Sequence, residues 1–198
     1  MATDNNDKLL RHAGVDRLFH WVTAATMTVL LVTSLLPIVG IRFAWLEIHW
    51  IAGLVLTLAI VLHILRTLLW QRIRTIWFRG GDFRAGALAG KYTLAQKLMH
   101  LGWTVAVLVA IATGLALLVK AGVPFLERNP YLYSLKTWGV LTLLHDLAAL
   151  LSLFLILVHV YFAVLPEKRA YLRAMLNGWI TRGELKGTHD LERVSRGD

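Results

Sequence analysis

One stretch of this chain, residues 138–165, is an almost unbroken apolar run that carries two histidines, His145 and His159. Because a helix turns by about 100° and rises by about 1.5 Å per residue, their spacing returns the helix to nearly the same face about 21 Å further along. The two imidazoles are therefore expected on one face at two depths. Ionisable groups inside a membrane are costly and often functional, and neutral imidazole is a common axial ligand of haem iron. The pattern predicts one wall of a site for two haems.

The composition indicates that the whole chain is a membrane protein. Of its 198 residues, 57% are apolar and only 17% are charged, and the mean hydropathy is +0.60. A soluble domain of this size is much more polar. Cysteine is absent, which excludes disulfides, thiolate-held iron–sulfur clusters, cysteine zinc sites and thioether-attached haem. The net charge of +9 does not indicate nucleic-acid binding, because the Lys and Arg residues cluster beside the apolar runs.

The apolar runs predict an all-α fold, an integral membrane four-helix bundle. The expected spans are about residues 16–36, 47–70, 95–119 and 138–165. Each has at least the ~20 residues that cross a hydrocarbon core of ~30 Å. The first span has an acidic flank and a long apolar stretch, so we expect a retained helix and not a signal peptide. Residues 1–180 are expected to form a single domain that binds two haems.

The segments outside the spans are predicted from their composition. Residues 1–15 are polar and are expected to form a loosely ordered tail in which His12 is solvated. The link 71–94 is basic, with apolar residues typical of a segment lying in the membrane interface. Residues 168–180 carry their apolar side chains on one stripe, which predicts a helix on the membrane surface. Residues 181–198 are expected to form a polar, mobile tail.

The distribution of basic residues predicts the orientation in the membrane. The link 71–94 and the segment after Pro166 are rich in Lys and Arg, whereas the loops 38–46 and 120–137 carry few. Because Lys and Arg mark the cytoplasmic side, both termini are expected in the cytoplasm.

This orientation assigns a depth to each histidine of the spans. Two are expected near the outer surface, His49 and His145, and four near the inner surface, His20, His63, His100 and His159. The outer two lie on separate helices, which is what one bis-histidine haem needs. At the inner level His159 could share its iron with His20 or with His63. Spacing alone favours His63, because His49 and His63 are separated by the same interval as His145 and His159.

Two residues one turn away from histidines have two interpretations each. Gly53 follows His49 and would let a flat macrocycle approach the helix, or would simply allow close helix packing. Arg66 follows His63 and would pair with a haem propionate, or would extend to the interface.

Several short stretches resemble the cytochrome b (gamma) subunit of membrane-bound formate dehydrogenases, within the wider group of cytochrome b subunits of respiratory hydrogenases and thiosulfate reductases. They occur in family order across all four spans and cover about residues 15–180. The matching stretches are Val15-Asp16-Arg17-Leu18-Phe19-His20-Trp21, His49 with Gly53, Gly90-Lys91-Tyr92 followed by Gln96-Lys97, Leu144-His145, and Leu157-Val158-His159-Val160-Tyr161.

The resemblance implies which histidines ligate iron. In that family, the histidines at the positions of His49 and His145 hold the outer haem b, and those at the positions of His20 and His159 hold the inner haem b. The resemblance therefore favours His20 over His63 as the inner ligand, against the spacing argument.

The resemblance also implies a quinone site near the inner haem, with Thr93, Gln96 and Lys97 as candidate contacts. The chain has Thr93 and Ala95 where the formate enzymes tend to have Asn and Gly, so this part matches less well. Lys97 would otherwise be an anchor at the membrane edge. His100 is expected to be an interface histidine and not a proton relay.

The implied function is that of a subunit, not of a complete enzyme. It would pass electrons from a periplasmic iron–sulfur subunit through two haem b groups to menaquinone or ubiquinone in a bacterial inner membrane, with a molybdenum or tungsten catalytic subunit in the same complex. Two alternatives stay open. One is a cytochrome b of a hydrogenase or of a quinol-oxidising thiosulfate-type reductase, with electrons running outward in the latter case. The other is a haem-free membrane anchor or transporter.

Overall fold

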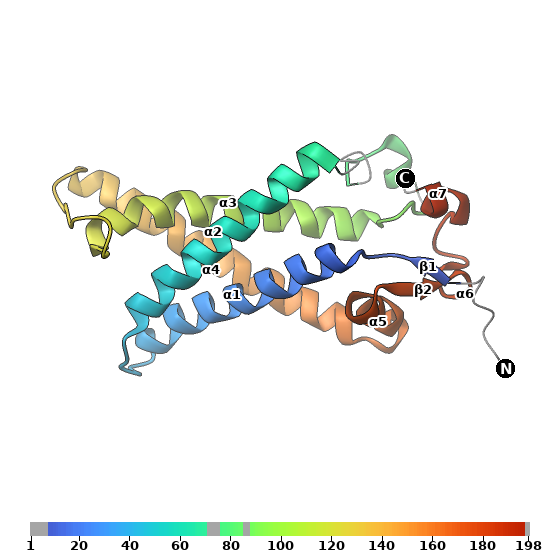
Figure 1. Cartoon of the computed structure of the whole chain (residues 1–198), viewed down its shortest axis with the longest axis horizontal. Coiled ribbons are helices and arrows are strands. Elements are labelled where there is room, and N and C mark those ends of the chain that lie inside the picture. The colour runs from blue at the N-terminus through green and yellow to red at the C-terminus, as the bar shows by residue number, and fades with distance from the viewer. Residues whose placement is uncertain (1–7, 71–75, 85–87, 197–198) are drawn as a thin grey trace. The chain divides into compact units, whose positions relative to one another are not determined.

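The computed structural model describes residues 8–70, 76–84 and 88–196 and contains four long helices (Figure 1). They are α1 (Gly14–Ile38), α2 (Trp45–Trp70), α3 (Leu94–Ala121) and α4 (Leu135–Val164). All four are long and apolar enough to cross a membrane. They begin and end close to the predicted limits, so the all-α membrane fold is confirmed. The interfacial segment predicted in the link falls partly on residues 71–75, which lie outside the described residues.

Short elements follow or flank the long helices. They are β1 (Lys8–Leu10), η3 (Gly80–Phe83), η4 (Pro166–Lys168), α5 (Arg169–Asn177), β2 (Trp179–Thr181), α6 (Arg182–Leu185) and α7 (Leu191–Arg196). Strands β1 and β2 pair antiparallel, with Leu9 opposite Ile180. This small sheet was not expected from the sequence.

The two terminal segments differ from the tails that the sequence predicts. The N-terminal segment contributes β1, and the C-terminal segment contributes β2, α6 and α7. Ile180 and Leu185 are fully buried, together with Ala174 of α5, and Leu9 packs against them. This cluster joins the two ends of the chain, so the periodicity of either segment alone could not predict it. His12 is half-buried and so less solvated than expected, and its backbone N–H donates to the Gly178 carbonyl at 3.2 Å.

The helix predicted over residues 168–180 is shorter in the structure. Helix α5 ends at Asn177, and Gly178 caps it with a φ of 93°, which only glycine adopts without strain. The backbone N–H of Gly178 donates to the Ala174 carbonyl at 2.8 Å. The chain then leaves the helix, so Trp179 and Ile180 lie in β2. That this helix rests on the membrane surface stays a prediction.

The chain divides into two compact units, and every long helix contributes to both. The first unit comprises the described residues of 1–21, 62–101 and 158–198, and the second comprises 22–61 and 102–157. The single two-haem domain expected over residues 1–180 stays a prediction.

The core of the second unit contains residues from all four long helices. Met27 of α1, Leu56 of α2 and Val107 of α3 are buried together, and Ile156 of α4 packs against them. Most other apolar side chains of these helices are exposed, with Leu150 and Phe154 as examples. A large exposed apolar surface on a folded chain indicates contact with lipid.

Candidate functional site

The second unit holds one pair of histidines. His49 of α2 and His145 of α4 have ring centroids 6.2 Å apart, with the ring planes at 70°. If one metal ion binds both imidazoles, the distance between the two ring centres has four parts. Two are metal–nitrogen bonds of about 2 Å, and two are the distances of about 1.1 Å from each nitrogen to its ring centre, which gives about 6 Å in all. The observed separation is therefore close to the one that a single metal ion bound by both rings would need.

Each of these rings contacts a buried threonine. Oγ1 of Thr33 on α1 lies 2.8 Å from Nδ1 of His49, and Oγ1 of Thr113 on α3 lies 2.9 Å from Nδ1 of His145. Thr33 is 2% exposed and Thr113 is 5% exposed. All four long helices thus supply one side chain to this site.

Two glycines lie beside this pair. A Cβ atom at Gly114 would come within 3.2 Å of Cε1 of His145, so the absence of a side chain there lets the ring lie against α3. A Cβ atom at Gly53 would meet only Leu30, at 4.0 Å, which is ordinary contact. Neither interpretation of Gly53 is decided by this distance.

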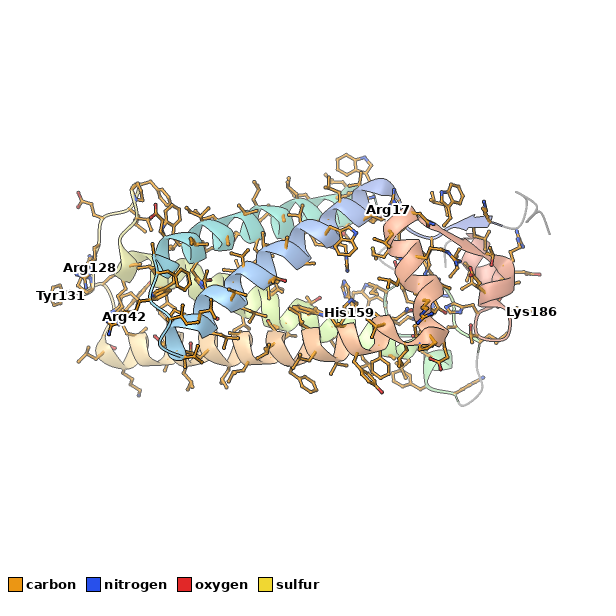
Figure 2. The ribbon with its side chains drawn as sticks, turned by 90° about the horizontal axis from the view of Figure 1, so that it is seen from below. Arg17, Arg42, Arg128, Tyr131, His159 and Lys186 are labelled. Carbon is orange, nitrogen blue, oxygen red and sulfur yellow. The ribbon has the colours of Figure 1, made fainter. Side chains whose placement is uncertain are left out.

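The first unit holds the second pair. His20 of α1 and His159 of α4 also have ring centroids 6.2 Å apart, with the planes at 50°. Figure 2 shows the His159 ring projecting from α4 towards α1. Nδ1 of His20 is buried and has no hydrogen-bond partner among the described residues.

The other histidines of the first unit lie in different surroundings. The ring of His63 stacks on Phe19, with centroids 4.1 Å apart and planes at 11°. His100 of α3 is exposed. Arg66 forms an ion pair with Asp16 near the start of α1, a partner that the sequence analysis did not anticipate. The structure thus pairs His159 with His20, while one face of the His63 ring is covered by Phe19.

The candidate quinone contacts make hydrogen bonds at the start of α3. The backbone N–H of Gln96 donates to Oγ1 of Thr93 at 3.3 Å, and the backbone N–H of Thr93 donates to Oε1 of Gln96 at 3.0 Å. This reciprocal arrangement is a capping box, which satisfies backbone donors at a helix start. Whether either residue contacts a quinone stays a prediction.

Lys97 is buried, unlike the membrane-edge anchor considered above. Its ammonium group donates to Oδ2 of Asp82 at 2.6 Å and to the carbonyl of Trp77 at 2.9 Å. Lys97 is 4% exposed and Asp82 is 7% exposed. The pair joins α3 to the link that precedes it.

The first unit also contains a buried guanidinium that the sequence analysis did not single out. Arg11 donates from Nη2 to the carbonyl of Lys91 at 2.9 Å, and its guanidinium carbon lies 4.8 Å from the ring centroid of Tyr171. Burial lowers the pKa of Arg11. Burial, with the nearby charges of Arg11 and Lys91, also lowers the pKa of His12 to about 4. Helical periodicity could not indicate this cluster, because its members come from separate segments.

Membrane-spanning helices that bring imidazoles together in pairs are typical of membrane cytochromes. Comparison with known families agrees: the sequence model of the prokaryotic cytochrome b561 family matches residues 11–178. The chain belongs to this family. It is a multi-pass membrane protein with the electron-transfer role of a cytochrome b, and membership implies haem b as its cofactor.

A curated relative gives a finer comparison. The chain is 24% identical, over 199 aligned positions, to the formate dehydrogenase cytochrome b556 subunit of Haemophilus influenzae. The alignment covers 89% of this chain and 79% of the relative. This similarity agrees with the family resemblance inferred from the motifs.

Proposed function

We propose that this chain is the membrane subunit through which electrons pass between an iron–sulfur subunit and membrane quinone, with two haem b groups as carriers. The observation that carries the proposal is the presence of two histidine pairs, each with ring centroids 6.2 Å apart. One pair would suffice for a single-haem cytochrome. Two pairs with the same separation favour two haems.

The residues present fit both groups. His49 and His145 would hold the iron of the outer haem, and His20 and His159 would hold the iron of the inner haem. Pairing of His159 with His20 is favoured by the ring separation, whereas His63 already stacks on Phe19. The shared helix α4 carries one ligand of each pair.

When bound, the two haems would supply reversible one-electron carriers. The chain's own contribution is to fix the orientation of four imidazoles and to surround them with apolar side chains. In the second unit, Met27, Leu56 and Val107 form a buried apolar cluster. A dry, low-dielectric surrounding disfavours charge at the iron and so affects the reduction potential.

The complex that we propose is formate dehydrogenase, on the basis of the relative's name. The partners would then be an iron–sulfur subunit and a molybdenum or tungsten catalytic subunit. We place the docking surface on the loops that follow α1 and α3. There Trp138 donates from Nε1 to the carbonyl of Pro130 at 2.8 Å, and a hollow of about 380 Å³ is lined by Trp45, Trp50 and Pro124 among others. The hydrogen bond between Trp138 and Pro130 holds the loop after α3 against α4, and a partner subunit would bind beside it.

Quinone would be bound in the first unit, beside Thr93, Gln96 and Lys97. The cytoplasmic position of both termini, predicted from the basic segments, would put this site on the inner side. Formate itself would not contact this chain.

The test is to purify the full chain from membranes, measure its haem content, reduce it chemically and follow its reoxidation by a soluble quinone analogue. Two haem b groups per chain, both reoxidised by a soluble quinone analogue, are expected. A colourless protein would contradict the proposal and favour a haem-free anchor. Co-purification with a hydrogenase or a thiosulfate-type reductase in place of a molybdenum or tungsten formate dehydrogenase would correct the partner and leave the two-haem function in place.

A further inference from the structure

The hydrogen bonds of Thr33 and Thr113 favour one position for the proton on each ring of the His49–His145 pair. Each threonine oxygen also lies close to a carbonyl of its own helix: Thr33 is 2.8 Å from the Val29 carbonyl, and Thr113 is 2.7 Å from the Val109 carbonyl. A carbonyl oxygen can only accept a hydrogen bond, and a hydroxyl has one proton to donate.

These distances favour a hydroxyl proton that each threonine donates to the carbonyl of its own helix. The lone pair that remains on Oγ1 accepts from the imidazole, so the ring proton lies on Nδ1. Nε2 is then unprotonated, which is the form that coordinates a metal. The threonine contacts therefore favour the ligating tautomer of both rings before any iron is bound.

The His20–His159 pair differs in its outer contacts. Nδ1 of His20 is buried and has no hydrogen-bond partner in the described part of the chain. The ring separation is the same in both pairs, so the pairs differ in what lies behind the rings.

Resting on the two-haem function proposed above, we propose that Thr33 and Thr113 are positioning residues that lower the reduction potential of the outer haem below that of the inner haem. An acceptor behind Nδ1–H makes an imidazole more basic, and a more basic ligand stabilises ferric over ferrous iron. His49 and His145 both have such an acceptor, whereas His20 lacks one. Electron transfer from the outer site to the inner site is then downhill, so this difference favours inward flow.

The experiment is a redox titration of the purified full chain carrying Thr33→Val, Thr113→Val or both. Valine has the same shape and removes only the hydroxyl. The lower of the two midpoint potentials should rise in each single variant. The expected rise is at most about 59 mV, which is a tenfold change in the equilibrium constant for reduction by one electron. The rise should be larger in the double variant, and the g values of one low-spin ferric signal should change with it.

Two further variants are the controls. Thr28→Val makes the same substitution on α1, where the hydroxyl is exposed and bonds only to the Ala24 carbonyl at 2.8 Å, and it should leave both potentials unchanged. Thr33→Ser keeps a hydroxyl and should keep the wild-type potentials. If a valine variant loses the outer haem, the serine variant must retain that haem at its wild-type potential.

The outcomes separate this inference from the function on which it rests. Two haems whose potentials are the same in wild type and in the valine variants would overturn the role of the threonines alone. A rise of the higher potential instead of the lower one would overturn it as well. A wild-type chain without two haems would overturn the proposed function, and this inference with it.

Discussion

The His49–His145 pair and the His20–His159 pair have ring centroids at the same separation, 6.2 Å, but lie in different surroundings. Behind the first pair are two buried, neutral hydroxyls on the neighbouring helices. The second pair belongs to the unit that also contains the ion pairs Asp16–Arg66 and Lys97–Asp82 and the terminal sheet. The two histidine pairs therefore have the same ring separation but different polar surroundings. This difference predicts that the two sites respond to different changes.

The largest expected effect is the complete loss of one haem. Replacing His145 with Ala should remove only the haem of the His49–His145 pair, because His159 and His20 belong to the other unit. Haem content by pyridine haemochrome should fall by half. Loss of both haems, or of neither, would mean that the two sites are not independent.

A smaller effect on the same site is expected at Gly114. A Gly114→Val side chain would press against the His145 ring, which already lies 3.2 Å from the position of a Cβ atom. Partial loss of the outer haem is expected, measured as the haem-to-protein ratio and as a changed low-spin ferric signal. Gly139→Val on α4 is the matched control, since nothing lies within 4 Å of its Cβ position. If both variants lost the same amount of haem, the cause would be the helix propensity of valine and not contact with the His145 ring.

The first unit should instead be sensitive to its buried ion pair. Lys97→Met removes the cation from the buried Asp82 carboxylate and should lower the free energy of unfolding by about 3–5 kcal/mol. The comparison is Glu184→Gln, which breaks the more exposed pair with Arg173 and should cost less than about 1 kcal/mol. Thermal unfolding of both variants in detergent measures the difference. Similar losses would show that burial does not set the strength of these pairs.

The smallest effect is expected from pH, and only in the first unit. The pKa values of His12 and His189 are lowered to about 4, chiefly by burial. The unfolded chain binds these protons below about pH 6.5, whereas the folded chain binds them only near pH 4. The two histidines therefore contribute their full stabilisation above about pH 6.5, and this contribution is lost as the pH falls towards 4. The protection factors of the amides in β1 and β2, which are exchange rates corrected for the intrinsic effect of pH, should therefore be smaller at about pH 5 than at about pH 7.5. A His12→Gln, His189→Gln variant should show a weaker dependence.

Properties that depend on one segment could be predicted from the sequence, whereas contacts between segments could not. The four long helices followed from hydropathy, because hydropathy is a local property. The outer and inner depths of the histidines stay a prediction. Thr28 and Thr33 lie on the same helix, and both bond to backbone carbonyls four residues earlier. Only the packing of α1 against α2 makes Thr33 a partner of His49, so no local pattern could have selected it.

Non-local contacts account for the other differences. Spacing favoured His63 as a partner of His159, whereas the family motif favoured His20; the structure brings His20 to His159 and stacks His63 on Phe19. The terminal sheet depends on Leu9 meeting Ile180 across almost the whole length of the chain. The pairing of Asp16 with Arg66 is of the same kind. Each of these contacts depends on packing between segments, which periodicity does not report.

The most direct test of the account is the haem content of the wild-type chain beside His20→Ala and His63→Ala. The account predicts two haems in the wild type, one in His20→Ala and two in His63→Ala, with the remaining haem of His20→Ala at the lower potential. Loss of a haem only in His63→Ala would contradict the pairing of His20 with His159 and would assign His63 as the inner ligand.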